Sequence, residues 1–86
     1  MSVHLQIAEQ VRKHREAQKR FLSLDANREE AIEQTFAEAK AGKAIQITEI
    51  NRITKEMNKI AMTFHFPARK VVTVEMIQEH LSDEMK

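Results

Sequence analysis

Residues 21–30 read FLSLDANREE, and the fold depends on how this stretch is interpreted. Asn27 followed three residues later by Glu30 is typical of a capping box, in which the asparagine oxygen accepts a bond from the backbone at a helix start. Glu29 and Glu30 would also complement the helix dipole at that point. The pattern predicts a break just before Asn27 and two helices that fold back on each other.

The apolar periodicity of the flanking residues supports a different interpretation. One stripe of the first segment runs through Ile7, Val11, Phe21 and Leu22, and at 100° per residue it continues into residues 32–39. A single helix through this stretch would be about 55–60 Å long. So long a rod would require a partner chain to cover it. We favour the break and keep the continuous helix as the alternative.

Other signals order the rest of the chain. Gly42, the single glycine, is placed to end a helix at the C′ position. Thr48 and Thr73 are predicted N-caps of two more helices, and residues 63–70 between those helices contain the single proline. The short β-favouring stretches before the two caps either pair as a ribbon or pack as hydrophobic staples. We favour staples.

The sequence thus predicts an all-α fold, a four-helix array with an N-terminal antiparallel helical hairpin, in one domain over residues 1–86. One glycine and one proline exclude a turn-rich β-sandwich or barrel. Dimerisation is an open possibility, because so short a chain has little surplus of apolar burial over conformational entropy. The expected helices lie near residues 3–22, 28–41, 49–62 and 74–83.

Composition also restricts the compartment and the partners. The chain has no cysteine, starts without the basic and apolar runs of a secretory signal, and has no apolar stretch near the roughly 20 residues of a membrane helix. We therefore expect a soluble, cytoplasmic protein with no membrane partner. Charge alternates in sign along the chain, which argues against a globally basic nucleic-acid-binding protein.

No group of residues fits a catalytic or metal-binding pattern. No two histidines are three or four residues apart, as two metal ligands on one helical face would be. The chain also lacks a cysteine nucleophile and a glycine-rich phosphate loop. We expect no enzymatic activity, no metal site and no cofactor. The histidines considered are His4, His14, His65 and His80.

The candidate interface follows from the apolar stripe near the N-terminus. His14 and Gln18 lie one turn apart at its centre, where buried polar groups without partners cost about 1–3 kcal/mol. They either protrude into water, are hydrogen-bonded in the core, or form a polar layer that sets register between helices. The missing chemistry and the apolar excess favour a protein–protein interaction or self-association module, as a homo-oligomer or with a protein partner. The candidate interface residues are Ile7, Val11, His14, Gln18 and Phe21.

A nucleic-acid-associated regulator is the alternative function. Basic residues gather on one side of the predicted helix 49–62 and in the loop after it, a face that could contact phosphates. The last predicted helix is acidic, however, and the loop before it exceeds the turn of a helix-turn-helix unit. Nucleic acid is therefore not the favoured partner. The candidate residues for this face are Arg52, Lys55, Lys59, Arg69 and Lys70.

Two stretches carry a resemblance to a known family. They are Leu24-Asp25 with Arg28-Glu29 and Ile32, and RKVVTVEMI over residues 69–77. The sequence resembles a family of small uncharacterised proteins of spore-forming Gram-positive bacteria, and the match spans most of the chain. That family carries only a domain-of-unknown-function label. The resemblance implies a bacterial, cytoplasmic, helical domain, and it transfers neither an activity nor a site residue.

Overall fold

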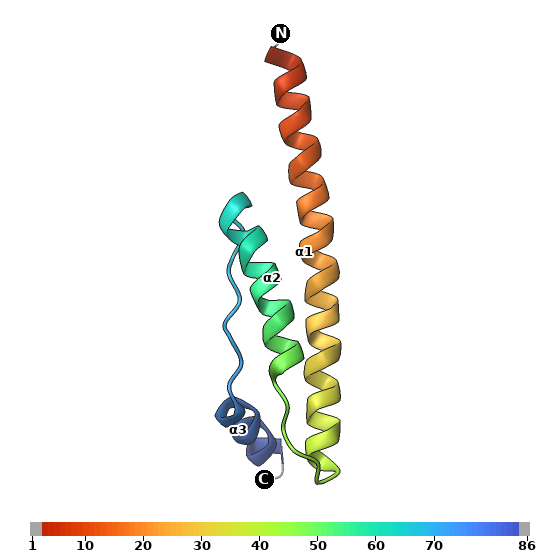
Figure 1. The fold of residues 1–86 in the computed structure, drawn as a ribbon, viewed down its shortest axis with the longest axis vertical. Helices are drawn as coiled ribbons and strands as arrows, with labels where there is room; N and C mark the ends of the chain where they lie inside the picture. Colours follow the sequence, from red (N-terminus) through yellow and green to blue (C-terminus); the bar gives the residue numbers. More distant parts are fainter. Residues whose placement is uncertain (1–2, 85–86) are drawn as a thin grey trace.

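The protein folds into three helices in a computed structural model that describes residues 3–84 (Figure 1). α1 spans Val3–Lys40, α2 spans Thr48–Phe64 and α3 spans Val74–Glu84. The all-α prediction is confirmed. The four-helix count and the N-terminal hairpin are wrong, because the first two predicted helices are one continuous helix.

Tertiary packing on both sides of the expected break keeps α1 continuous. Phe21 before it and Ala31, Ile32 and Phe36 after it all pack against apolar clusters that include residues of α2. No glycine or proline interrupts α1, and an asparagine inside a helix costs only about 0.6 kcal/mol relative to alanine. Asn27 is therefore an exposed residue in the middle of α1. The capping-box pattern is a local signal that the contacts with α2 override.

The C-terminus of α1 confirms the predicted role of Gly42. This glycine has a φ of 86°, which side chains disfavour. Its N–H donates to the Ala39 carbonyl at 3.1 Å, and the Lys43 N–H donates to the Glu38 carbonyl at 2.9 Å. These two bonds form a Schellman motif, which satisfies carbonyls that the helix itself leaves unpaired.

The two ends of α2 depart from the prediction. Ile47 is its N-cap residue and makes no side-chain capping bond, so the prediction that Thr48 caps this helix is wrong. At the other end His65 adopts the left-handed conformation, with a φ of 60°. The Phe66 N–H donates to the Ala61 carbonyl at 3.0 Å. Histidine thus occupies the position where a Schellman motif usually has glycine.

The start of α3 follows the prediction. The Thr73 Oγ1 accepts a hydrogen bond from the Met76 N–H at 3.2 Å, which confirms Thr73 as the N-cap. Val72 before the cap and Ile77 in the first turn are buried in the same apolar cluster, as in a hydrophobic staple. Within residues 3–84 no strand forms, so the two β-favouring stretches do not pair as a ribbon.

The core consists of two apolar clusters along α2. The first joins Phe21 of α1 to Ile53, Met57 and Ala61 of α2. The second joins Ile50 of α2 to the residues around the start of α3. Because both clusters lie against the middle and C-terminal parts of α1, they leave the N-terminal turns of that helix outside the core.

The molecule is a rod because α1 is longer than everything packed against it. Its extents are 61 × 21 × 16 Å, and its radius of gyration is 17.4 Å, compared with about 12 Å for a compact chain of this length. Figure 1 shows the N-terminal turns of α1 standing clear of α2 and α3. We call residues 3–12 the N-terminal extension of α1.

Candidate functional site

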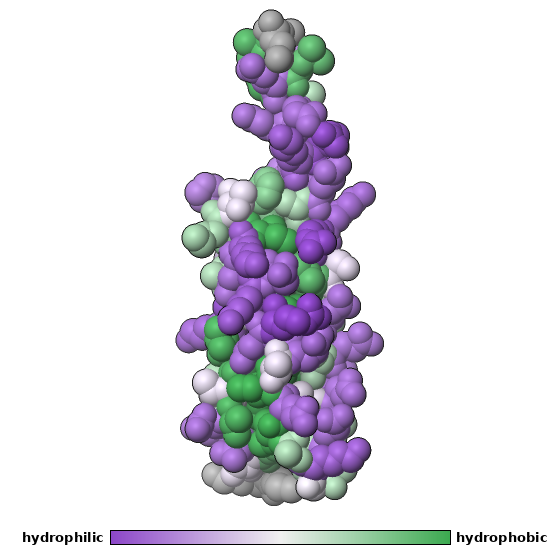
Figure 2. All heavy atoms as spheres, viewed as in Figure 1, coloured by the Kyte–Doolittle hydropathy of each residue, from purple (hydrophilic) through white to green (hydrophobic). Residues whose placement is uncertain are grey.

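The N-terminal extension carries several large apolar side chains that the chain does not cover. The exposed fractions are 67% for Val3, 66% for Leu5, 52% for Ile7 and 44% for Val11. Figure 2 shows apolar side chains at the tip of the extension, above a mostly hydrophilic neck. Exposed apolar residues gathered on one short helical segment mark a contact surface more often than scattered ones do.

The predicted interface residues divide between this surface and the core. Ile7, Val11, His14 and Gln18 line one shallow groove along α1. Phe21, in contrast, is buried in the first apolar cluster. The stripe predicted from the sequence therefore divides: Ile7, Val11 and Leu22 face solvent, whereas Phe21 packs against α2.

His14 and Gln18 lie where the core meets the solvent. The His14 ring makes edge contacts with the rings of Phe64 and Phe66, at centroid distances of 6.1 and 5.2 Å. Both residues are exposed. Of the three interpretations offered for this pair, the geometry matches the one in which their side chains face water. Phe66 packs against the first apolar cluster, and Phe64 stacks on Phe66.

A second, apolar notch continues the groove toward the body of the molecule. Gln18 and Leu22 of α1 line it together with Phe66 and Pro67. Leu22 is 58% exposed although it lies at the middle of α1. The uncovered apolar surface therefore extends from Ile7 to Leu22 along one face of the helix.

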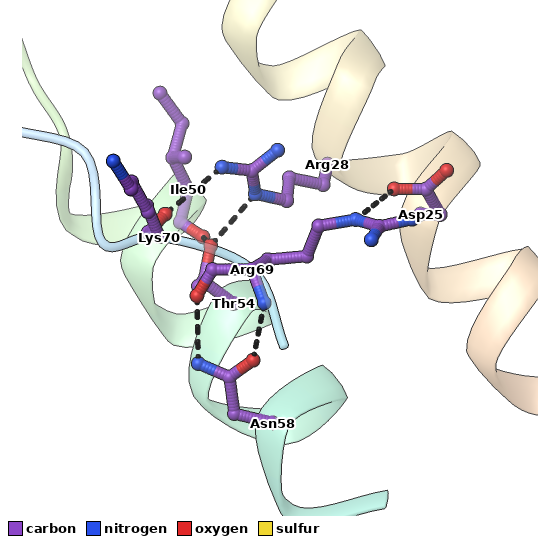
Figure 3. Close-up of polar contacts among 7 residues, drawn as sticks. All are labelled: Asp25, Arg28, Ile50, Thr54, Asn58, Arg69 and Lys70. Carbon is purple, nitrogen blue, oxygen red and sulfur yellow. Dashed lines mark hydrogen bonds and ion pairs between the residues drawn. The ribbon is translucent and has the colours of Figure 1, made fainter. Parts of the chain in front are cut away.

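A polar network holds the chain between α2 and α3 against α2. The Asn58 side chain brackets the backbone of Arg69: its Oδ1 accepts from the N–H at 2.8 Å and its Nδ2 donates to the carbonyl at 3.0 Å (Figure 3). Asn51 brackets Val72 in the same way, at 2.8 and 2.9 Å. Asn51 and Asn58 are seven residues apart on the helix, about 10.5 Å along its axis. Their partners Arg69 and Val72 are three residues apart in extended chain, about 10 Å, so the two pairs of bonds can form together.

Side chains of α1 complete this network. The Arg28 Nε donates to the Thr54 Oγ1 at 2.9 Å, and its terminal nitrogen donates to the Lys70 carbonyl at 3.1 Å. The Arg69 Nε donates to Asp25 at 3.4 Å (Figure 3). Its guanidinium also lies over the Phe21 ring, 5.3 Å from the centroid. These polar groups are engaged with one another, which makes the network a structural lock.

Sequence reasoning missed this lock. Asn51 and Asn58, seven residues apart on one helical face, are the signal that could have pointed to it. The extended partner segment has no periodicity that would reveal it. The roles of Asp25 and Arg28 depend on contacts with residues more than 20 positions away.

The structure separates the candidate nucleic-acid residues into those paired with acidic residues on α2, those exposed to solvent, and Arg69. Arg52 donates to Glu49 at 2.6 and 3.1 Å, and this bond raises the pKa of Arg52 and lowers that of Glu49. Lys59 lies 3.6 Å from Glu56, and Lys55 is exposed beside them. Arg69 belongs to the lock, and Lys70 is exposed on the extended segment. Acidic neighbours thus interrupt the basic face on α2.

Two further findings concern sites of other kinds. Among residues 3–84, no three histidine, cysteine or carboxylate side chains gather as a metal ion would need. None of the three helices in this described part combines the length and the apolar character that crossing a bilayer requires.

Comparison with known proteins places the chain in a family. Residues 1–83 match the family described as "Protein of unknown function (DUF2533)". The chain is also 35% identical over 80 residues to "Uncharacterized protein YpbS" of Bacillus subtilis (strain 168), covering 93% of this chain and 94% of that protein. No solved structure matches. These matches confirm the resemblance drawn from the sequence, and the chain belongs to the DUF2533 family of proteins of unknown function.

Proposed function

We propose that this protein is a non-catalytic, cytoplasmic protein-interaction module whose contact element is the N-terminal extension of α1. The observation that carries the proposal is the exposure of Ile7 and Val11 on a helical segment that stands clear of the rest of the chain (Figure 1). Completing the burial of two such side chains in a partner would contribute roughly 1 kcal/mol each.

The helical state of the extension supports the same proposal. A helix of about ten residues is marginal on its own in water, so the extension depends on α1 below it for nucleation. A partner that packs on the extension would stabilise its helical form as well as cover its apolar side chains. Function and local order would then be coupled.

The other polar and charged surfaces are less suited to binding. The polar groups of the lock are already hydrogen-bonded to the segment before α3. The basic side chains on α2 lie beside Glu49 and Glu56. A nucleic-acid ligand would have to displace these acidic partners, at a cost in electrostatic energy. The extension presents apolar surface without such competition.

Site-specific photo-crosslinking in living cells tests the proposal. A photoreactive amino acid replaces Ile7 in the full chain, expressed in a Gram-positive host, and a matched chain carries it at Met62, which is 83% exposed on α2. We expect a discrete protein adduct from position 7 that position 62 does not give. A second substitution, Val11→Glu, should remove that adduct because a buried carboxylate is costly. Identical adducts at both positions, none at position 7, or no effect of Val11→Glu would contradict the proposal.

A further inference from the structure

We infer that the partner of α1 is a second copy of this chain, packed antiparallel along α1 with Leu22 at the two-fold axis. This inference rests on the proposed function and assigns its binding partner. It uses the exposed face of α1 on which Ile7, Val11 and Leu22 lie.

The surface area of the chain is the first argument. Its accessible surface is 6713 Å², about 1,500 Å² more than the roughly 5,200 Å² of a compact monomer of 10.0 kDa. A standard protein–protein interface covers about 800 Å² on each partner. The excess is thus large enough for one such interface, and α1 supplies most of the length of the rod.

The charge distribution along α1 is the second argument, and it sets the direction. Residues 3–20 hold five basic and two acidic side chains, a net +3, whereas residues 21–40 hold two basic and five acidic ones, a net −3. A parallel pair would place like charges side by side along the whole length. An antiparallel pair places the basic half of each helix on the acidic half of the other.

The position of the exposed residues is the third argument, and it sets the register. Leu22 lies at the centre of the 38-residue helix, and Val11, Arg15 and Glu29 lie on the same side at helical spacing. With the two Leu22 side chains facing each other, Arg15 of one copy lies opposite Glu29 of the other. Ile7 then lies at the same level along the pair as Ala37 of the second copy, an exposed small residue that permits close approach.

This arrangement gives the extension a place to pack. The extension of each copy runs along the C-terminal half of the other copy's α1, and the same patch is used twice, as in an isologous dimer. The extensions of both copies are then covered at once.

Cysteine crosslinking of the purified chain tests the geometry, since the chain has no cysteine of its own. With a short thiol-reactive crosslinker, Leu22→Cys should give a covalent dimer at least tenfold faster than the exposed control Met62→Cys. Ile7→Cys alone should give none, because antiparallel packing holds the two copies of that position about 45 Å apart. An equimolar mixture of Ile7→Cys and Ala37→Cys should give the dimer. Equal rates for Leu22→Cys and Met62→Cys, or a dimer of Ile7→Cys alone, would overturn the inference.

Charge reversal gives an independent test by light scattering across a hundredfold dilution. Arg15→Glu and Glu29→Arg, each alone, should raise the dimer dissociation constant about tenfold, since each turns two attractive pairs into repulsive ones. The double variant should restore it. Circular dichroism checks that every variant folds. A double variant as weak as the single ones, or a monomer at every concentration, would overturn the antiparallel dimer.

The two proposals fail in different ways. If the purified chain is monomeric while the adduct at position 7 has the mass of another protein, the second copy is wrong and the interaction module stands. If neither a dimer nor an adduct forms, both are wrong.

Discussion

The N-terminal extension and the rest of α1 belong to one helix, yet they are stabilised in different ways. From His14 onward α1 packs against α2, the residues before α3, or α3 itself, with Ala17, Phe21 and Thr35 buried. The extension has comparable side chains but stands clear of these elements (Figure 1). The difference teaches that helical periodicity reports which side chains could be buried, while the length of the neighbouring helix decides which ones are.

The largest expected effect comes from removing a core side chain and comparing it with one in the extension. Met57 of α2 is fully buried, and Met57→Ala should lower the unfolding free energy by about 3 kcal/mol. Ile7→Ala should cost less than about 0.5 kcal/mol in dilute, monomeric protein. Urea unfolding measures both. A comparable loss for Ile7→Ala under dilute conditions would mean that the extension is packed within its own chain.

A smaller loss is expected when the lock is opened. Asn58→Ala leaves the N–H and the carbonyl of Arg69 without their partners, and it should cost about 1–2 kcal/mol in the same assay. Hydrogen exchange should also become faster at the Arg69 amide. If the amide keeps its protection, the extended segment is held by its apolar contacts alone.

The smallest expected effect is that of Asn27→Ala, and the sign of its change in unfolding free energy is what matters. Asn27 is the counterpart of Asn58 that faces solvent on α1. In a continuous helix Asn27→Ala should raise the unfolding free energy by about 0.5 kcal/mol, because alanine is the better helix former. If Asn27 were a helix cap, the same change would lower it by about 1 kcal/mol. Thermal unfolding of the two proteins distinguishes these outcomes and tests the continuity of α1.

Local signals of the sequence predicted several elements well. Gly42 ends α1 and Thr73 begins α3, because each role depends on the residue's own backbone or side chain and a few neighbours. The candidate interface stays a prediction, and its residues divide between the surface and the core. Ile7 and Val11 are exposed together as an interface requires, whereas Phe21 is a core residue. Nothing local to these positions distinguishes them, since they share one stripe.

The errors arose where a weak local preference met a strong distant contact. The capping pattern at Asn27 is worth about 1 kcal/mol, less than the burial of several side chains of α1 against α2 on both sides of it. Arg69 looked like part of a basic face, but Asp25 of α1 engages it. Such partners are separated by tens of residues, and their separation follows no regular period that sequence analysis could detect.

The amino-acid order alone determined the helical class, the stop after Lys40, the cap of α3 and the existence of one long apolar stripe. Only the tertiary structure decided that α1 is unbroken, that its stripe divides into a buried and an uncovered part, and that Arg69 holds the segment before α3 in place. The physical reason is one of range. Capping and helix propensity act within a turn or two, whereas burial depends on which segments the whole chain brings together.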